Sequence, residues 1–244
     1  MNSLAIPQHL QFDGEIPSEA RELAGQLAKM EPEKSGLSDW QLARLGKITC
    51  SHFGEVKYLK SGAWGETALT YLYDLIGEHL TGQPSELFSG SRATEWGNQY
   101  EEEALAAYKQ RTGRKTKPGH FLPDRVLPLV GGTPDAFCGE QGVLEIKCPF
   151  NFKNHLRTVI TKKVPDDYKS QVLGHLMLSG REWCDFVSYD PRIKTNHRLV
   201  IVRVRAKEVQ AEMDELAQRI IDFHGLLLKQ LETLKIRSIH PIKV

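Results

Sequence analysis

Apolar residues recur along this chain with different periods, and the period separates predicted helices from predicted strands. Five ranges place apolar residues three or four positions apart, which is the spacing of one helix face; they are 18–30, 65–80, 92–111, 166–178 and 208–234. Five short ranges predict strands; they are 127–130, 133–137, 143–148, 184–189 and 199–204. A turn is expected at Gly131 and Gly132, loops at 81–91 and 151–163, and a loose arm over 1–16, where no period is visible.

The hairpin predicted over 133–148 carries the clearest sign of chemistry. Side chains alternate between the two faces of a strand, so Glu145 and Lys147 project to the same side, away from the apolar residues between them. The turn residues 139–142 allow the two strands to pair, which brings Asp135 beside Glu145.

Two carboxylates and a backbone carbonyl form a hard oxygen site that suits Mg²⁺. An ammonium group beside them can orient a water molecule or neutralise charge that develops on a phosphate. An acid and a lysine at this spacing also occur on the exposed face of ordinary strands, so the spacing alone leaves both interpretations open.

Residues 44–51 are a candidate phosphate site. A loop with Gly46 leads to Thr49 and Ser51, which are both good helix caps. A helix start offers free N–H groups and a partial positive charge, which together hold a phosphate, and Arg44 could add a bidentate grip. The alternative is that Thr49 or Ser51 only caps a helix and that Arg44 is a surface charge.

Two further polar residues lie on predicted helices. Glu101 shares a stripe with apolar residues, an unusual place for a carboxylate unless it is used; the alternative is a partly exposed acid at the rim. Gln171 and His175 are four residues apart and share a face. Gln171 could hydrogen-bond a water or a lysine at the site, whereas His175 is interpreted as a structural histidine and is assigned no role.

The composition is ordinary for a globular enzyme, with 244 residues of which 40% are hydrophobic and 26% charged. The formal net charge is +1, so a DNA partner would have to meet local positive charge. Two basic clusters are candidates for DNA contact, although such clusters are also common on solvated surfaces; they are Arg111, Arg114, Lys115 and Lys117, and in the 151–163 loop Lys153, His155, Arg157, Lys162 and Lys163.

The four cysteines are scattered without a C-x-x-C pair, which favours reduced thiols in the cytosol over disulfides, zinc or an iron–sulfur cluster. No apolar run approaches the roughly 20 residues of a membrane span. The N-terminus lacks the pattern of a signal peptide.

Pro134-Asp135 followed by Glu145-Ile146-Lys147 resembles the signature of the PD-(D/E)XK nucleases. With other segments in the same order, the chain resembles the phage lambda exonuclease family, the YqaJ-like viral recombinases. The ordered segments are residues 44–51, Trp96 to Glu101, residues 133–150, and Gln171-Val172 followed by Tyr189 to Arg192.

The resemblance implies an α/β, restriction-endonuclease-like fold, a central mixed β-sheet flanked by helices, in a single nuclease domain over residues 1–244. It also implies an enzyme that digests linear double-stranded DNA from the 5′ end, releases mononucleotides and leaves 3′ single-stranded tails for recombination. The implied partners are double-stranded DNA ends, two further copies of the chain in a trimeric ring, and a single-strand annealing protein, but no membrane. The implied location is the cytoplasm of a bacterial host, with a phage or prophage as the source.

By position, the resemblance implies that Asp135, Glu145 and the carbonyl of Ile146 hold metal. Two Mg²⁺ ions are expected, with Mn²⁺ as a substitute, and Glu101 would support the second ion directly or through water. Lys147 would position the nucleophilic water.

In the same way, Gln171 would lie in the layer behind the metal ligands, and Arg44, Ser51 and Thr49 would bind the 5′-phosphate. Thr94 occupies the position of an apolar residue that in the family is thought to wedge open the end of the duplex, so the wedge has no assigned residue here.

Two rival functions remain open. One is a PD-(D/E)XK nuclease of another polarity or with endonuclease action. The other is a non-catalytic DNA-end-binding module, against which the intact set of Asp135, Glu145 and Lys147 argues.

Overall fold

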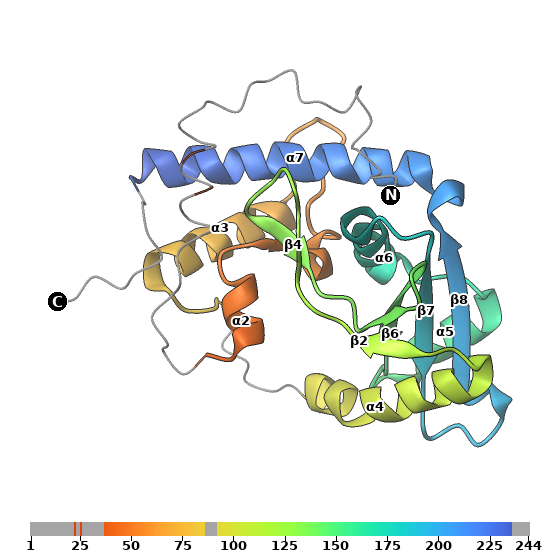
Figure 1. Ribbon diagram of the computed structural model, residues 1–244. Helices are drawn as coiled ribbons and strands as arrows, with labels where there is room; N and C mark the ends of the chain where they lie inside the picture. The colour runs from red at the N-terminus through yellow and green to blue at the C-terminus, as the bar shows by residue number, and fades with distance from the viewer. Residues whose placement is uncertain (1–21, 23–24, 26–36, 86–91, 236–244) are drawn as a thin grey trace. The chain divides into compact units, whose positions relative to one another are not determined.

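The computed structural model describes residues 22, 25, 37–85 and 92–235 (Figure 1). The chain forms two compact units, one from 1–87, 121–132 and 211–244 and the other from 88–120 and 133–210. The expected arm over 1–16 and most of the helix expected over 18–30 lie outside the described residues; of that helix only Glu22 and Gly25 are described, both helical. A single nuclease domain over the whole chain stays a prediction.

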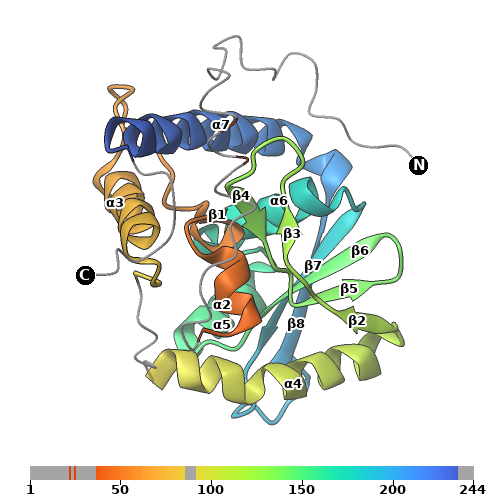
Figure 2. The same cartoon turned by 60° about the vertical axis from the view of Figure 1, so that its left-hand side comes forward.

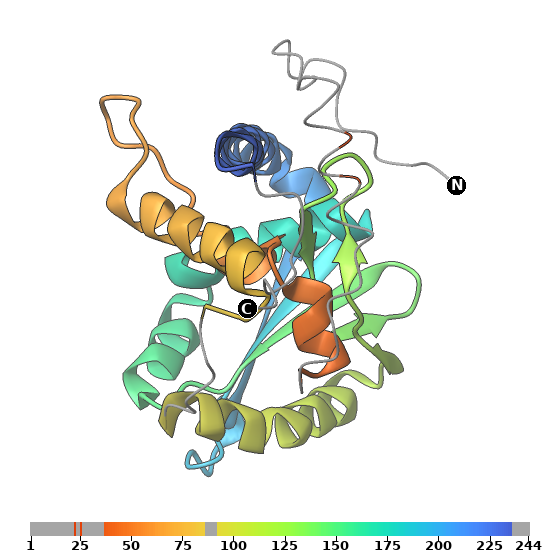
Figure 3. The same cartoon turned by 90° about the vertical axis from the view of Figure 1, so that its left-hand side faces the viewer.

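The first unit joins a small sheet to several helices. The sheet has the order β1-β4-β3, with β1 (Ile48–Thr49) parallel and β3 (Leu122–Pro123) antiparallel to β4 (Val130–Gly132). The helices are α2 (Asp39–Arg44), the 3-10 turn η2 (Cys50–His52), α3 (Glu66–Thr81) and, from residue 211 onward, α7 (Gln210–Thr233). Figure 3 views α7 almost end-on.

The core of the first unit forms where α7 buries one face. Met213, Leu216, Ile220, Phe223 and Leu227 are all buried, as the helical period predicts. The Phe223 ring stacks on Tyr71 of α3, with ring centroids 5.8 Å apart.

The second unit contains a five-stranded mixed sheet with the order β2-β5-β6-β7-β8 (Figure 2). Its strands are β2 (Thr116–Pro118), β5 (Ala136–Cys138), β6 (Gly142–Lys147), β7 (Trp183–Tyr189) and β8 (Leu199–Arg205). Only β6 and β7 pair in parallel, and the connection between them carries α5 (Phe152–Thr161) and α6 (Asp166–Ser179). The unit also contains α4 (Arg92–Thr112) and the 3-10 turns η3 (Asn196–Arg198) and η4 (Ala206–Glu208).

Strand alternation in β6 separates a core face from a polar face. Leu144 and Ile146 join the buried cluster that contains Ala104 and Tyr108 of α4. Glu145 projects to the other face, where α6 supplies its contact. Helices therefore cover both faces of the mixed sheet, and the expected fold class is confirmed.

Four predicted helices agree with α3, α4, α6 and α7 to within two residues, and the strands predicted over 143–148, 184–189 and 199–204 agree equally well with β6, β7 and β8. The predicted loop over 151–163 is wrong, because most of it forms α5. This helix buries His155 and Thr158, which are polar, so a search for apolar periodicity misses it. Helix α6 begins at Asp166, with Pro165 at its N-cap.

The turn expected at Gly131 and Gly132 is wrong as well, because both residues lie in β4. A Cβ atom at Gly131 would come within 2.2 Å of Cζ of Phe121, so this glycine serves a close approach rather than a turn. The strand predicted over 127–130 is confirmed only at Val130, and the one over 133–137 begins only at Ala136.

All four cysteines are buried, and none of them forms a disulfide. None of the helices in the described part of the chain is both long enough and apolar enough to cross a bilayer.

Candidate active site

The predicted hairpin places Asp135 beside Glu145. Strands β5 and β6 pair antiparallel with Ala136 opposite Leu144, and the N–H of Asp135 donates to the carbonyl of Leu144 at 3.1 Å. The carboxylate of Asp135 then accepts a short hydrogen bond of 2.5 Å from the N–H of Ile146. Asp135, which lies just before β5, is thus held against β6, the strand that carries Glu145 and Lys147.

The carboxylate of Glu145 is fully buried and is held at both oxygens. Its Oε1 lies 2.5 Å from Nζ of Lys147, and its Oε2 lies 2.8 Å from Nε2 of His175. Burial raises the pKa of Glu145, but the positive charge of Lys147 and the contact with His175 outweigh burial and lower the pKa to about 2. The group is therefore an anion over the whole neutral range.

The pKa of Asp135 moves in the opposite direction. Burial raises it well above its usual value, and the neighbouring negative charge of Glu145 raises it further. The pKa of Lys147 is also raised, because the charges of Glu145 and Asp135 outweigh the effect of burial. The site concentrates negative charge, which the ammonium group of Lys147 partly offsets.

Glu101 lies at the rim of this site. Its side chain is exposed on α4, whose buried residues are Ala104 and Tyr108, so the carboxylate does not face the apolar core. Its pKa is nevertheless raised, first by desolvation and then by the charge of Glu145. Gln171 is half-buried on α6, one turn before His175.

These donors suit a hard divalent cation. Within the described ranges, no three His, Cys, Asp or Glu side chains converge as a ready-made metal cage. Mg²⁺ does not require one, because it keeps several waters and binds through one or two carboxylates. The buried carboxylate of Glu145 and the half-buried carboxylate of Asp135 supply oxygen donors whose mutual repulsion a cation would relieve.

His175 is the residue that sequence reasoning undervalued. The prediction treated it as structural, but its imidazole contacts the carboxylate of Glu145, and both side chains are about 1% exposed. Its Nδ1 is buried and has no hydrogen-bond partner among the described residues. The available signal was its position four residues after Gln171, on a helix that follows the signature strand.

The candidate phosphate residues come together in the first unit. Arg44 ends α2, and its Nη2 donates to Thr49 Oγ1 at 3.1 Å and to Ser51 Oγ at 2.8 Å. The guanidinium carbon lies 4.5 Å from the centroid of the Trp40 ring. Thr49 occupies the N-cap of η2 but makes no capping bond with its side chain, so the hydroxyls serve Arg44 rather than a helix start.

Comparison with known proteins gives a consistent result. The model of the YqaJ-like viral recombinase domain matches residues 39–182, more than half of the chain. No curated protein matches.

Among solved structures, the alkaline exonuclease LHK-Exo from Laribacter hongkongensis is 30% identical, with 81% of this chain and 95% of that chain covered and a TM-score of 0.71. The same exonuclease has been solved with dAMP, with 28% identity, coverage of 81% and 97%, and a TM-score of 0.69. A phage-related exonuclease from Haemophilus somnus, at 18% identity, coverage of 76% and 96%, and a TM-score of 0.57, shares the fold. The chain belongs to the YqaJ-like viral recombinase family.

Proposed function

We propose that this protein is a Mg²⁺-dependent exonuclease that digests linear double-stranded DNA from the 5′ end, releasing mononucleotides and leaving 3′ single-stranded tails. The observation that carries the proposal is the buried carboxylate of Glu145 in contact with Lys147, with Asp135 fixed beside it. LHK-Exo, similar over most of its length, is an alkaline exonuclease, and its complex with dAMP fits mononucleotides as the product class.

In this proposal Asp135, Glu145 and the carbonyl of Ile146 hold metal, and Glu101 acts on a second ion from the rim. Bound Mg²⁺, or Mn²⁺ in its place, would act as a Lewis acid and lower the pKa of a bound water. Lys147 stays protonated at neutral pH because its pKa is raised, so it can hold the nucleophilic water or offset charge on the scissile phosphate.

Gln171 would support the water or Lys147 from α6. His175 would keep the carboxylate of Glu145 in one orientation through its 2.8 Å contact. The imidazole at Oε2 and the ammonium group at Oε1 would together set the orientation in which Glu145 offers its carboxylate to a metal ion.

The 5′ polarity is assigned to Arg44, Thr49 and Ser51. A guanidinium with two hydroxyl groups offers a charged donor and two neutral ones, which suit a terminal phosphate. An enzyme that holds this phosphate would prefer phosphorylated 5′ ends.

The biological role proposed is phage-type recombination by single-strand annealing. The 3′ tails would be passed to a single-strand annealing protein, and the enzyme would work as a homotrimeric ring in the bacterial cytoplasm. Family membership supports this assignment.

Digestion of linear duplexes labelled at either the 5′ or the 3′ end tests the proposal directly. The 5′ label should appear first in acid-soluble mononucleotides, only with Mg²⁺ or Mn²⁺, while a closed circular duplex stays intact. Early release of the 3′ label would indicate the opposite polarity, and nicking of the circle would indicate an endonuclease.

Lys147→Ala is the matched inactive variant for this assay. It should lose turnover by at least about a hundredfold while still binding DNA, because the lysine acts on charge in the reaction rather than on the duplex. Lys207→Ala, which removes an exposed lysine outside both basic clusters, serves as the control. Undiminished cleavage by Lys147→Ala would remove the lysine from the mechanism.

A further inference from the structure

Phe150 is a large apolar side chain that the fold leaves in solvent. It follows the signature lysine by three residues, and 46% of its surface is exposed. The residues that follow it, Asn151, Phe152 and Lys153, are all exposed as well, so polar, aromatic and basic side chains lie next to each other along the chain.

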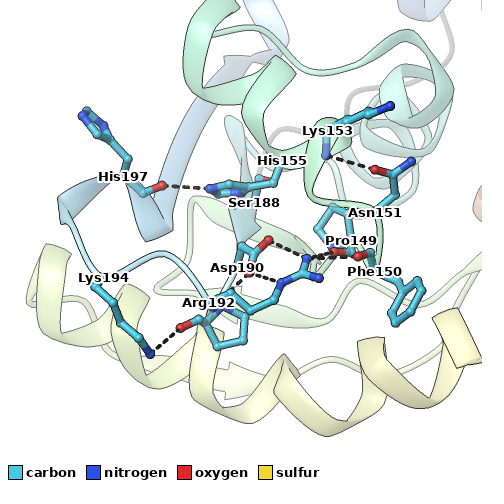
Figure 4. A network of polar contacts seen from close by, with 11 residues as sticks. Pro149, Phe150, Asn151, Lys153, His155, Ser188, Asp190, Arg192, Lys194 and His197 are labelled. Atoms are coloured by element: carbon cyan, nitrogen blue, oxygen red, sulfur yellow. Dashed lines mark hydrogen bonds and ion pairs between the residues drawn. The ribbon is translucent and has the colours of Figure 1, made fainter.

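The backbone at Phe150 is fixed by Arg192. Nη2 of Arg192 donates to the carbonyl of Phe150 at 3.0 Å and lies 3.4 Å from the carbonyl of Pro149 (Figure 4). The guanidinium is itself held by the fully buried carboxylate of Asp190, with Nε–Oδ1 at 2.8 Å and Nη2–Oδ2 at 2.7 Å. A bidentate pair of this kind sets both the position and the plane of the arginine.

The ring of Phe150 also contacts the side chain of Trp96. It meets Trp96 edge to face, with centroids 5.8 Å apart and an interplanar angle of 78°. Cζ of Arg192 lies 4.6 Å from the centroid of the same indole. The same arginine therefore contacts both the backbone of Phe150 and the side chain against which its ring rests.

The helix that follows is anchored to the same part of the sheet. Asn151 caps α5 by accepting from the N–H of Lys153 at 3.1 Å. His155 joins this helix to Ser188 Oγ and to the carbonyl of His197, both at 2.8 Å. The segment 149–155 is thus tied at both ends to the β7–β8 hairpin and its connection, as Figure 4 shows.

We propose that Phe150 stacks against a nucleobase of the DNA substrate and that Arg192 is the positioning residue that holds it for this contact. An aromatic ring with a fixed backbone loses little conformational freedom on binding. Stacking on such rings is tolerant of sequence because every base has an aromatic face, and basic side chains normally accompany it. The inference rests on the proposed function, because it assumes that DNA reaches the segment next to Lys147.

The test is binding of a 3′-tailed duplex with 2-aminopurine at successive positions near the single-strand junction, with Ca²⁺ in place of Mg²⁺ to prevent turnover. The wild type should quench the fluorophore at a particular position. Phe150→Ala should lose that quenching and bind about five- to a hundredfold more weakly. Phe150→Trp should restore both, since it keeps an aromatic face.

Arg192→Lys should weaken quenching while the fold is retained, because lysine keeps the charge near Asp190 but cannot make the bidentate pair. Tyr73→Ala, which removes an even more exposed aromatic ring from α3, should bind and quench like the wild type. Thermal unfolding of each variant checks that the fold is intact.

Wild-type quenching by Phe150→Ala, or failure of Phe150→Trp to restore it, would overturn the proposal. So would unchanged DNA binding by Phe150→Ala together with an altered sedimentation mass, which would make the ring a protein contact. If the wild type cleaves DNA but shows no position-specific quenching, only the stacking role fails. If it neither binds nor cleaves DNA, the proposed function fails as well.

Discussion

Asp135 and Glu145 are neighbouring carboxylates with opposite proton affinities. The difference arises from their partners, because Glu145 has Lys147 and His175 against it, whereas Asp135 has the N–H of Ile146 and the charge of Glu145. The imidazole and the ammonium therefore decide which carboxylate stays ionised. His175 therefore matters for the site, although the sequence analysis assigned it no role.

Removal of the His175 contact should weaken metal binding. His175→Leu fills the space without a donor, so Glu145 loses its fixed orientation, and Mn²⁺ affinity should fall about tenfold. His175→Gln offers an amide donor and should recover most of that loss. Isothermal titration calorimetry with Mn²⁺ measures both, and equal affinity in all three proteins would reduce His175 to a packing residue.

Replacement of Arg44 should change the preference for 5′-phosphorylated ends more than the rate of hydrolysis itself. The wild type should digest a 5′-phosphorylated duplex faster than a 5′-hydroxyl duplex, and Arg44→Ala should reduce that ratio about tenfold because a charged hydrogen bond to the phosphate is lost. The measurement is the initial rate on the two duplexes at subsaturating DNA. A proportionate loss on both ends would argue against a phosphate contact.

At the scale of elements, α7 carries a buried histidine with no hydrogen-bond partner among the described residues. Burial lowers the pKa of His224 from its usual 6.5 to about 4. The unfolded chain then binds the proton more tightly than the folded one. Stability is therefore complete above pH 6.5 and is lost as the pH falls toward 4, by up to about 3 kcal/mol for one such group.

His224→Leu should flatten this acid dependence. Urea unfolding at pH 7 and pH 5 should give a smaller difference in the variant than in the wild type, with the exposed His120→Ala variant as a control that keeps the slope. Part of the slope should remain, because burial also lowers the pKa of His79 on α3 to about 4. An unchanged slope in His224→Leu would show that the histidine titrates normally in the fold.

The elements that the sequence predicted are those with an apolar face. Helices α3, α4, α6 and α7 and strands β6, β7 and β8 all bury apolar residues at the expected period. Helix α5 was missed because its inward residues, His155 and Thr158, are polar. His155 finds its partner Ser188 only in the folded sheet, and Thr158 donates back to the carbonyl of Asn154 within the helix. Gly131 was misassigned because the ring that excludes a side chain there belongs to Phe121, which lies just before β3 and meets the glycine only in the folded sheet.

In the candidate site as well, local contacts were predicted and contacts between distant residues were missed. Spacing within one strand predicted that Glu145 and Lys147 share a face, and a hairpin turn predicted the approach of Asp135. The contact between His175 and Glu145 joins residues 30 positions apart across a crossover, so no local pattern reveals it. Likewise, Arg44, Thr49 and Ser51 were expected to contact a phosphate independently. The hydrogen bonds that join them into one group were not predicted.

At the scale of the whole molecule, the residues proposed to hold metal and those proposed to bind the 5′-phosphate belong to different compact units. Asp135, Glu145 and Lys147 lie in the unit built from 88–120 and 133–210, and Arg44 lies in the other. The proposed 5′ polarity requires both groups to act on one DNA end. The two units alternate along the chain, because each is built from stretches that the other interrupts. A deletion that removes one unit would therefore also cut the other.

The proposed ring makes a prediction about mass and processivity together. Light scattering should give three times the chain mass of 27.6 kDa. A ring that encloses the duplex should also continue digestion after an excess of unlabelled competitor is added, because release requires passage off an end rather than simple dissociation. A gel of labelled duplex with and without the competitor follows this directly. A monomeric mass with digestion that stops at once on challenge would contradict the ring, and would leave Arg44 and the metal site to account for polarity within one chain.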